Sequence, residues 1–185
     1  MFYMDKNKAI LLVIDIQDRL SGSMQKDEFE IFFKQTKALI NGTNILHIPI
    51  MQSLQYVKGL GDSVGGLFDE GIQKIDFEKR VFSCCYEGSV LLDFLGQNRH
   101  IEQVIICGME THVCVLQSAR DLKRLNFDVV VACDAVISRD TNNKQNALDL
   151  MRVFGVCVAN IESILFDLLK DSRAVEFKAI SNLIK

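Results

Sequence analysis

The 185-residue sequence contains one proline and little net charge, and it has no block of like charges. A single proline and the lack of Pro/Gly/Ser-rich stretches exclude a collagen-like, disordered or low-complexity chain. The 49% hydrophobic and 24% charged residues are typical of a well-packed domain. Lys and Arg number 21 against 24 Asp and Glu, a formal charge of −3 that leaves no excess of positive charge to neutralise phosphates. We therefore expect no nucleic-acid partner and no membrane-surface partner.

The sequence also lacks an apolar run near the length that spans a bilayer. The apolar run Ala9 to Ile14 is cut short by Asp15 and has no small-residue cleavage site after it, which argues against a signal peptide. No linker, internal repeat or shift of composition divides the chain. We expect one domain over residues 1–185 and a cytoplasmic protein.

Metal-type and disulfide-type cysteine patterns are missing. The six cysteines form no CxxC pair, and they show no metal-like spacing with the three histidines, His47, His100 and His112. In a cytoplasmic protein the thiols are expected to stay reduced, so a disulfide framework is not expected. We expect no metal and no cofactor.

Short apolar runs alternate with longer amphipathic segments, which is the pattern of βα units around a parallel sheet that is buried on both faces. The sequence thus predicts an α/β fold, a three-layer αβα arrangement with a six-stranded, mostly parallel, Rossmann-like sheet. The expected strands are Ala9–Asp15, Ile45–Met51, Gln73–Phe77, Gln103–Cys107, Asp128–Ala132 and Val156–Asn160. The expected helices are Glu28–Asn41, which Asn41-Gly42 would end, Tyr86–Leu95, Cys114–Leu125, Asn142–Phe154 and Ile161–Leu169.

Three polar residues follow or end apolar strands, at the edge of a parallel sheet where ligands bind. Asp15 ends the first expected strand, Lys79 follows the third, and Cys114 follows the fourth. Each has an ordinary structural reading when taken alone. If the strand ends converge, however, an acid, a cation and a thiol come within hydrogen-bond reach of one another.

Cys114 has a context that the other cysteines lack, because it stands where a turn enters a predicted helix. A helix N-terminus favours the thiolate, and its N–H groups can hold an oxyanion. An adjacent ammonium would lower the thiol pKa further, while a nearby carboxylate could accept the thiol proton. This pattern predicts nucleophilic catalysis with a base other than histidine.

The strings VIDIQ, EKRVFS and CGMETHVCV, in this order and at these separations, resemble those of the isochorismatase-like cysteine hydrolases. The resemblance covers essentially the whole chain. It is nearest to the isochorismatase domain-containing branch, because SLQYVKGLG, ACDAVISR and FKAISNLIK are also similar to that branch. The three ordered motifs together make a strong signal, whereas any one of them alone would be weak.

The resemblance implies catalytic roles for three residues. Asp15 would be the proton acceptor, Lys79 the ammonium that polarises the site, and Cys114 the nucleophile that forms a thioester-type intermediate, which water then hydrolyses. It further implies a cis peptide bond between Met109 and Glu110, which would direct the N–H groups of Glu110 and Cys114 at the oxyanion as an oxyanion hole.

The resemblance also implies that Gln17 and Ser83 help line the substrate pocket, and Met109 and His112 are expected to be substrate-binding residues with them. His112 is read as a pocket-wall or structural residue, with a papain-like pairing to the thiol as the alternative. Metal-dependent nicotinamidases carry an Asp-x-His pair after the second strand, and the sequence MQSLQY has none, which argues against a metal and against that activity.

These features predict a cysteine hydrolase acting on a C–N bond of a small amide or related carbonyl substrate. Two alternatives stay open: a binding or scaffold protein of the same fold with little turnover, and a thiol redox sensor. Cys84 and Cys85 are read as packing residues rather than a redox pair. A homo-oligomer is expected, with Val175 to Ile184 either as a subunit contact or as a helix packed on its own domain.

Overall fold

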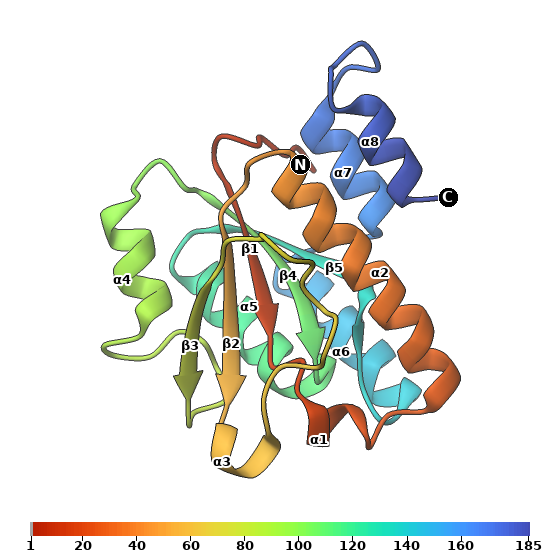
Figure 1. The fold of residues 1–185 in the computed structure, drawn as a ribbon. Coiled ribbons are helices and arrows are strands. Elements are labelled where there is room, and N and C mark those ends of the chain that lie inside the picture. Colours follow the sequence, from red (N-terminus) through yellow and green to blue (C-terminus); the bar gives the residue numbers. More distant parts are fainter. Residues whose placement is uncertain (1) are drawn as a thin grey trace.

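The computed structural model describes residues 2–185 and has a six-stranded sheet in the order β3-β2-β1-β4-β5-β6, with every neighbouring pair parallel. Figure 1 shows the sheet between two layers of helices, so the predicted α/β class and layered architecture are confirmed. The strands are β1 (Ala9–Ile14), β2 (Ile50–Gln55), β3 (Ile75–Lys79), β4 (Gln103–Met109), β5 (Asp128–Ile137) and β6 (Cys157–Ala159).

The helices divide between the two faces of the sheet. Side chains of α2, α7 and α8 share one apolar core with half of the sheet residues, and side chains of α4, α5 and α6 share the other. The helices are α1 (Asp18–Ser21), α2 (Lys26–Ile45), α3 (Val57–Leu60), α4 (Val90–Gln97), α5 (Leu116–Arg124), α6 (Thr141–Val153), α7 (Ile161–Leu169) and α8 (Phe177–Leu183). A π-helical turn, Thr111–Val115, precedes α5.

Strand β1 shows why the strand sequences lack polar alternation. Leu11 and Val13 belong to the core under α2, whereas Leu12 and Ile14 belong to the core on the opposite face. Successive strand residues point to opposite faces, and both faces are covered by helices, so every position is apolar. Asp15 therefore follows directly after a fully buried strand.

The second expected strand was misplaced. Residues 45 to 49 end α2 and form the turn that follows, and β2 begins only at Ile50. The Asn41-Gly42 pair does not end the helix, because Gly42 is buried where α2 crosses α7. A Cβ atom there would lie 2.5 Å from Leu165 Cδ2, so glycine serves the close approach of two helices rather than a helix end.

Two of the candidate site residues lie at slightly different points of their elements than the sequence predicts. Lys79 is the last residue of β3 and does not follow the strand. Cys114 lies inside the π-helical turn, and the regular helix begins two residues later at Leu116. The other expected helices agree with the structure to within a few residues at most, and α7 agrees at both ends.

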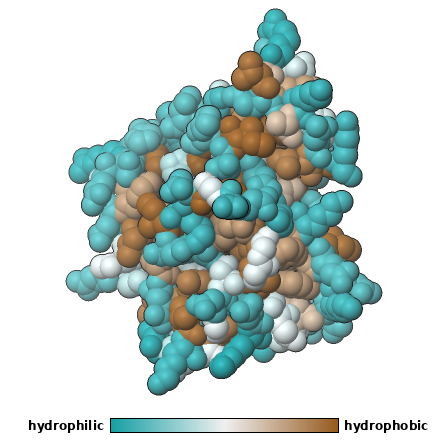
Figure 2. Space-filling view, in the orientation of Figure 1, coloured by the Kyte–Doolittle hydropathy of each residue, from teal (hydrophilic) through white to brown (hydrophobic). Residues whose placement is uncertain are grey.

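The C-terminal segment packs on its own chain. Ile180 of α8 is fully buried in the core with α2 and α7, and the rings of Phe166 and Phe177 lie 6.2 Å apart. Figure 2 shows separate apolar patches on this face of the molecule, including one at the right over α2. No helix within residues 2–185 is both long enough and apolar enough to cross a membrane.

Candidate functional site

A buried ion pair joins the ends of β1 and β3. Lys79 Nζ lies 2.7 Å from Asp15 Oδ2, and both side chains are completely buried. The other carboxylate oxygen, Asp15 Oδ1, accepts a hydrogen bond of 2.7 Å from the Ser53 hydroxyl on β2. Asp15 itself has a left-handed backbone (φ 52°), a conformation that turns the chain directly after β1. Two of the three candidate catalytic residues are therefore in direct contact.

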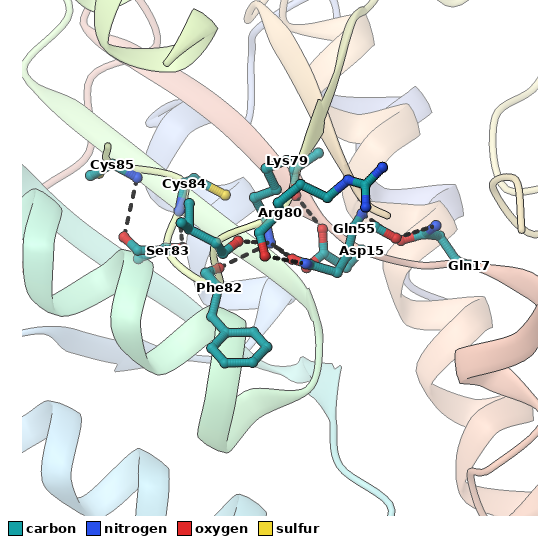
Figure 3. Close-up of polar contacts among 12 residues, drawn as sticks. Asp15, Gln17, Gln55, Lys79, Arg80, Phe82, Ser83, Cys84 and Cys85 are labelled. Carbon is teal, nitrogen blue, oxygen red and sulfur yellow. Dashed lines mark hydrogen bonds and ion pairs between the residues drawn. The ribbon is translucent and has the colours of Figure 1, made fainter. Parts of the chain in front are cut away.

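The Lys79 ammonium has other hydrogen-bond acceptors around it besides the Asp15 carboxylate. It donates to Gln55 Oε1 at 2.7 Å and to the Phe82 carbonyl at 2.9 Å, and the Val81 carbonyl lies at 3.3 Å. Figure 3 shows this ammonium beside the Asp15 and Gln55 side chains. Three N–H bonds are thus matched by protein acceptors, so Lys79 acts on the site through its charge and its fixed position.

Gln17 braces this network. Its side-chain Nε2 donates to the carbonyls of Gln55 and Gly61, at 3.1 and 2.6 Å, and its Oε1 accepts from the Gln55 N–H at 2.7 Å. The side chain is fully buried and ties the end of β2 to the loop that follows α3. This geometry assigns Gln17 a bracing contact rather than an open face toward a ligand.

Cys114 lies near the same ion pair, in the π-helical turn that follows β4. Its exposed fraction is 6%, and a hydrogen bond to the Asp15 carboxylate is among the causes that raise its thiol pKa. The Glu110 carbonyl accepts from the N–H groups of Val113 and Val115, the residues on either side of Cys114. The structure thus brings Asp15, Lys79 and Cys114 together.

The expectation that these surroundings favour the thiolate is wrong for the resting site. Burial raises the pKa of Cys114, the Asp15 charge raises it further, and the Lys79 charge lowers it only in part. A carboxylate that accepts the thiol's hydrogen bond stabilises the protonated form. The resting site therefore holds a neutral thiol beside a carboxylate that can accept its proton.

Lys79 remains an ammonium in this site. Burial alone would lower the pKa of Lys79, but the charge of Asp15 beside it outweighs the burial, so the net shift is upward. A buried lysine without such a partner would tend to lose its proton. The positive charge beside the thiol is therefore permanent near neutral pH.

The peptide bond between Met109 and Glu110 is cis, as the resemblance implied. Met109 is fully buried, and the Glu110 side chain accepts a hydrogen bond of 3.2 Å from the Arg139 N–H. His112 Nδ1 lies 3.0 Å from the Ser138 hydroxyl. That contact gives His112 a structural partner away from the thiol, which favours the pocket-wall reading over a Cys-His pair.

The residues after β3 line the same region. Ser83 is 7% exposed, and its hydroxyl accepts from the Cys85 N–H at 3.1 Å. Cys84 is fully buried, and its N–H donates to Ser118 Oγ at 2.9 Å. Burial, followed by the Asp15 charge, raises the pKa of Cys84 to about 11, and burial raises that of Cys85 to about 12. Both are protonated packing groups near neutral pH.

The sequence analysis missed Ser53 and Gln55. Both are polar residues near the carboxyl end of β2, the position that flagged Asp15, but the strand was expected to end at Met51. Correct placement of β2 would have directed attention to them. Within residues 2–185, no group of three or more His, Cys, Asp or Glu side chains is arranged to hold a metal ion.

The fold and the site together define an α/β protein with a buried thiol beside a carboxylate–ammonium pair. Residues 9–163 match the family model of the isochorismatase domain, so the chain belongs to the isochorismatase family. Isochorismatase family protein 1A from Dictyostelium discoideum is 37% identical over 94% of this chain and 84% of its own length. Mouse isochorismatase domain-containing protein 2A is 31% identical over 96% and 82%.

Solved structures show the same fold. A Caenorhabditis elegans protein described as MAR1 ribonuclease superposes with a TM-score of 0.88 and 29% identity, over 99% of this chain and 92% of its own. The YcaC protein of Escherichia coli, described as an octameric hydrolase of unknown specificity, has a TM-score of 0.88 and 21% identity over 100% and 90%. At that identity the second likeness concerns the fold alone. Family membership supports a hydrolase.

Proposed function

We propose that the protein is a cysteine hydrolase that cleaves a C–N bond of a small amide or related carbonyl compound. The observation that carries the proposal is the buried contact of 2.7 Å between Lys79 Nζ and Asp15 Oδ2, with the Cys114 thiol near enough for the Asp15 carboxylate to raise its pKa. A neutral thiol next to a fixed carboxylate is arranged for proton transfer as the sulfur attacks.

The reaction would begin when Cys114 Sγ attacks the substrate carbonyl carbon and its proton passes to Asp15. The N–H groups of Glu110 and Cys114 would stabilise the oxyanion that develops. Asp15 then returns the proton to the leaving nitrogen as the C–N bond breaks, which leaves a thioester on Cys114. Water hydrolyses the thioester, and the Lys79 charge stabilises the Asp15 carboxylate in each resting state.

The remaining pocket assignments belong to the same proposal. Ser83, Met109 and His112 would line the space above Cys114, while Gln17 would act through its contacts with Gln55. A homo-oligomer is proposed, consistent with the octameric state given for the Escherichia coli protein. The ribonuclease activity named for the Caenorhabditis elegans protein stays with that protein, because a formal charge of −3 gives this chain no general attraction to RNA.

Substitution of Cys114 tests the nucleophile. Cys114→Ala should abolish turnover on a panel of small primary amides and carbamoyl compounds, together with iodoacetamide labelling of the peptide that contains residue 114. Cys157→Ala, which removes a partly exposed thiol elsewhere, is the matched control and should keep both. Turnover that survives in Cys114→Ala contradicts the assignment.

Two other outcomes would favour the alternatives. If no amide is turned over while Cys114→Ala still retains a stable partner, a binding protein of the same fold is the better description. If low concentrations of peroxide rapidly remove the Cys114 thiol, redox sensing gains support. The raised pKa of Cys114 argues against the latter, because redox-sensor cysteines have low pKa values.

A further inference from the structure

A second group of reactive side chains surrounds a cavity that shares no lining residue with the proposed active site. The cavity has a volume of about 430 Å³, which falls within the range of small-molecule sites. Its walls include Ile31 and Phe32 of α2, Cys133, Asp134 and Ile137 of β5, and Lys144 of α6. Apolar side chains thus share one solvent-accessible cavity with an amine, a thiol and a carboxylate.

The sheet provides the room for this cavity. The pairing of β5 with β6 ends at Ala132, and the pairing of β5 with β4 changes register between Val131 and Val136. Residues 133–135 therefore have no register partner in either neighbouring strand. This irregular stretch presents Cys133 and Asp134 to the space between α2 and α6.

Lys144 is the amine of this cavity. It is half-buried, and within residues 2–185 no hydrogen bond or ion pair joins its ammonium to another group. Burial lowers the pKa of Lys144, and the nearby groups that oppose this shift are Cys133, Glu28 and Asp134. A lysine that is partly desolvated and unpaired is the form of this residue that acts as a nucleophile.

The carboxylates near Lys144 are already engaged elsewhere. Both oxygens of Asp134 accept from the Ile161 N–H, at 2.9 and 3.2 Å, and Glu28 accepts from the Thr141 hydroxyl at 3.0 Å. The contrast with Lys79 is direct, since its ammonium has an aspartate, an amide and a carbonyl as acceptors. Hydrogen bonds hold the Lys79 ammonium of the proposed active site in place, whereas the Lys144 amine of this cavity is available for reaction.

We propose that the cavity between α2, β5 and α6 is a covalent binding site for small apolar aldehydes, which Lys144 captures as an imine. The Nζ lone pair attacks the aldehyde carbon to give a carbinolamine, and loss of one water molecule forms the C=N bond. The amine gives up its two hydrogens with the carbonyl oxygen as that water, so no oxidant or reductant is required. Ile31, Phe32 and Ile137 hold the hydrocarbon part of the aldehyde.

Reductive trapping of the imine tests the proposal on the full chain. We expect limiting butanal with sodium cyanoborohydride at pH 7 to label Lys144 faster than Lys34. Lys34 is an exposed lysine of α2 and provides the internal reference. Peptide mass spectrometry measures both positions in the same sample.

Three variants locate the reaction. Lys144→Arg keeps the positive charge and should lose the butanal adduct, while Ile31→Asn alters an exposed apolar wall and should slow labelling of Lys144 but not of Lys34. Cys114→Ala should label as the unsubstituted protein does, because this site is independent of the proposed hydrolase chemistry. Labelling of Lys144 no faster than Lys34, or protection of Lys144 by a second copy of the chain, overturns the proposal.

Discussion

Lys79 and Lys144 show at the residue scale how surroundings decide what one side chain can do. The charge of Asp15 outweighs the burial of Lys79 and raises its pKa, whereas burial lowers the pKa of Lys144, which has no ion-pair partner within residues 2–185. The first is a permanent charge, and the second is an amine that can lose its proton. The same reasoning predicts how substitutions around Cys114 change the titration of its thiol.

Asp15→Asn and Lys79→Met should shift the reactivity of Cys114 in opposite directions. The Asp15 charge and hydrogen bond raise the pKa of Cys114, so their removal should lower it; the Lys79 charge lowers that pKa, so its removal should raise it. The pH profile of Cys114 alkylation should therefore move to lower pH in Asp15→Asn and to higher pH in Lys79→Met. Peptide-resolved alkylation rates measure the profiles.

Measurements of turnover in the same variants separate two roles of Asp15, its effect on the pKa of Cys114 and its role as proton acceptor. Asp15→Asn should lose amide hydrolysis even though its thiol alkylates at lower pH, because the proton acceptor is gone. Circular dichroism checks folding, since removing one partner of a buried ion pair costs about 3–5 kcal/mol. Profiles that move in the same direction in both variants would refute the electrostatic account.

At the scale of elements, the approach of β4 to β1 depends on Gly108. Its φ is +129°, and a Cβ atom there would lie 2.0 Å from the Ile14 carbonyl oxygen, one residue before Asp15. No side chain fits in this position without moving one of the two strands. The element that presents the cis peptide is thereby held against the element that presents the proton acceptor.

Gly108→Ala should destabilise the protein by about 2–4 kcal/mol through backbone strain and the strand clash, and should strongly reduce turnover. Gly96→Ala is the matched control, because it lies in α4 with nothing within 4 Å of the added methyl group. That change should be neutral or stabilise by up to about 1 kcal/mol. Urea unfolding measures both, and equal stabilities for the two variants would contradict the close-approach argument.

The elements also show which parts of the site the sequence could predict. Strand-end polarity was sufficient for Asp15, and the motif resemblance was sufficient for the cis peptide, because both are local signals. Ser53 and Gln55 were missed because Gly42 was read as a helix end, and only the crossing of α2 and α7 explains why it is not. The raised thiol pKa depends on burial from several elements, which no sequence window contains.

At the scale of the whole molecule, buried thiols make stability depend on alkaline pH. The pKa of Cys84 is raised from 9.0 to about 11, so the unfolded chain loses this proton first as the pH rises. A raised folded-state pKa stabilises the protein fully below pH 9.0, and that contribution, about 2–3 kcal/mol, is lost as the pH rises through the folded value.

We therefore expect the unfolding free energy to fall between pH 9 and 11, and Cys84→Ser to fall less steeply over this interval. Urea unfolding at a series of pH values, with Cys157→Ser as the control for a thiol that is less buried, provides the measurement. Parallel pH profiles for Cys84→Ser and the unsubstituted protein would show that Cys84 does not cause the fall in unfolding free energy.

Removal of the C-terminal segment tests whether this segment packs within its own chain or contacts a second chain. Truncation before Arg173 removes α8, including Ile180, which is fully buried, and Phe177, whose ring contacts Phe166. Losing the buried Ile180 side chain and the half-buried Phe177 side chain should cost about 3–6 kcal/mol. Because the contacts are intramolecular, the resulting fall in Tm should be the same at all protein concentrations. A subunit contact would instead give a Tm difference that grows with concentration, alongside a smaller particle by light scattering.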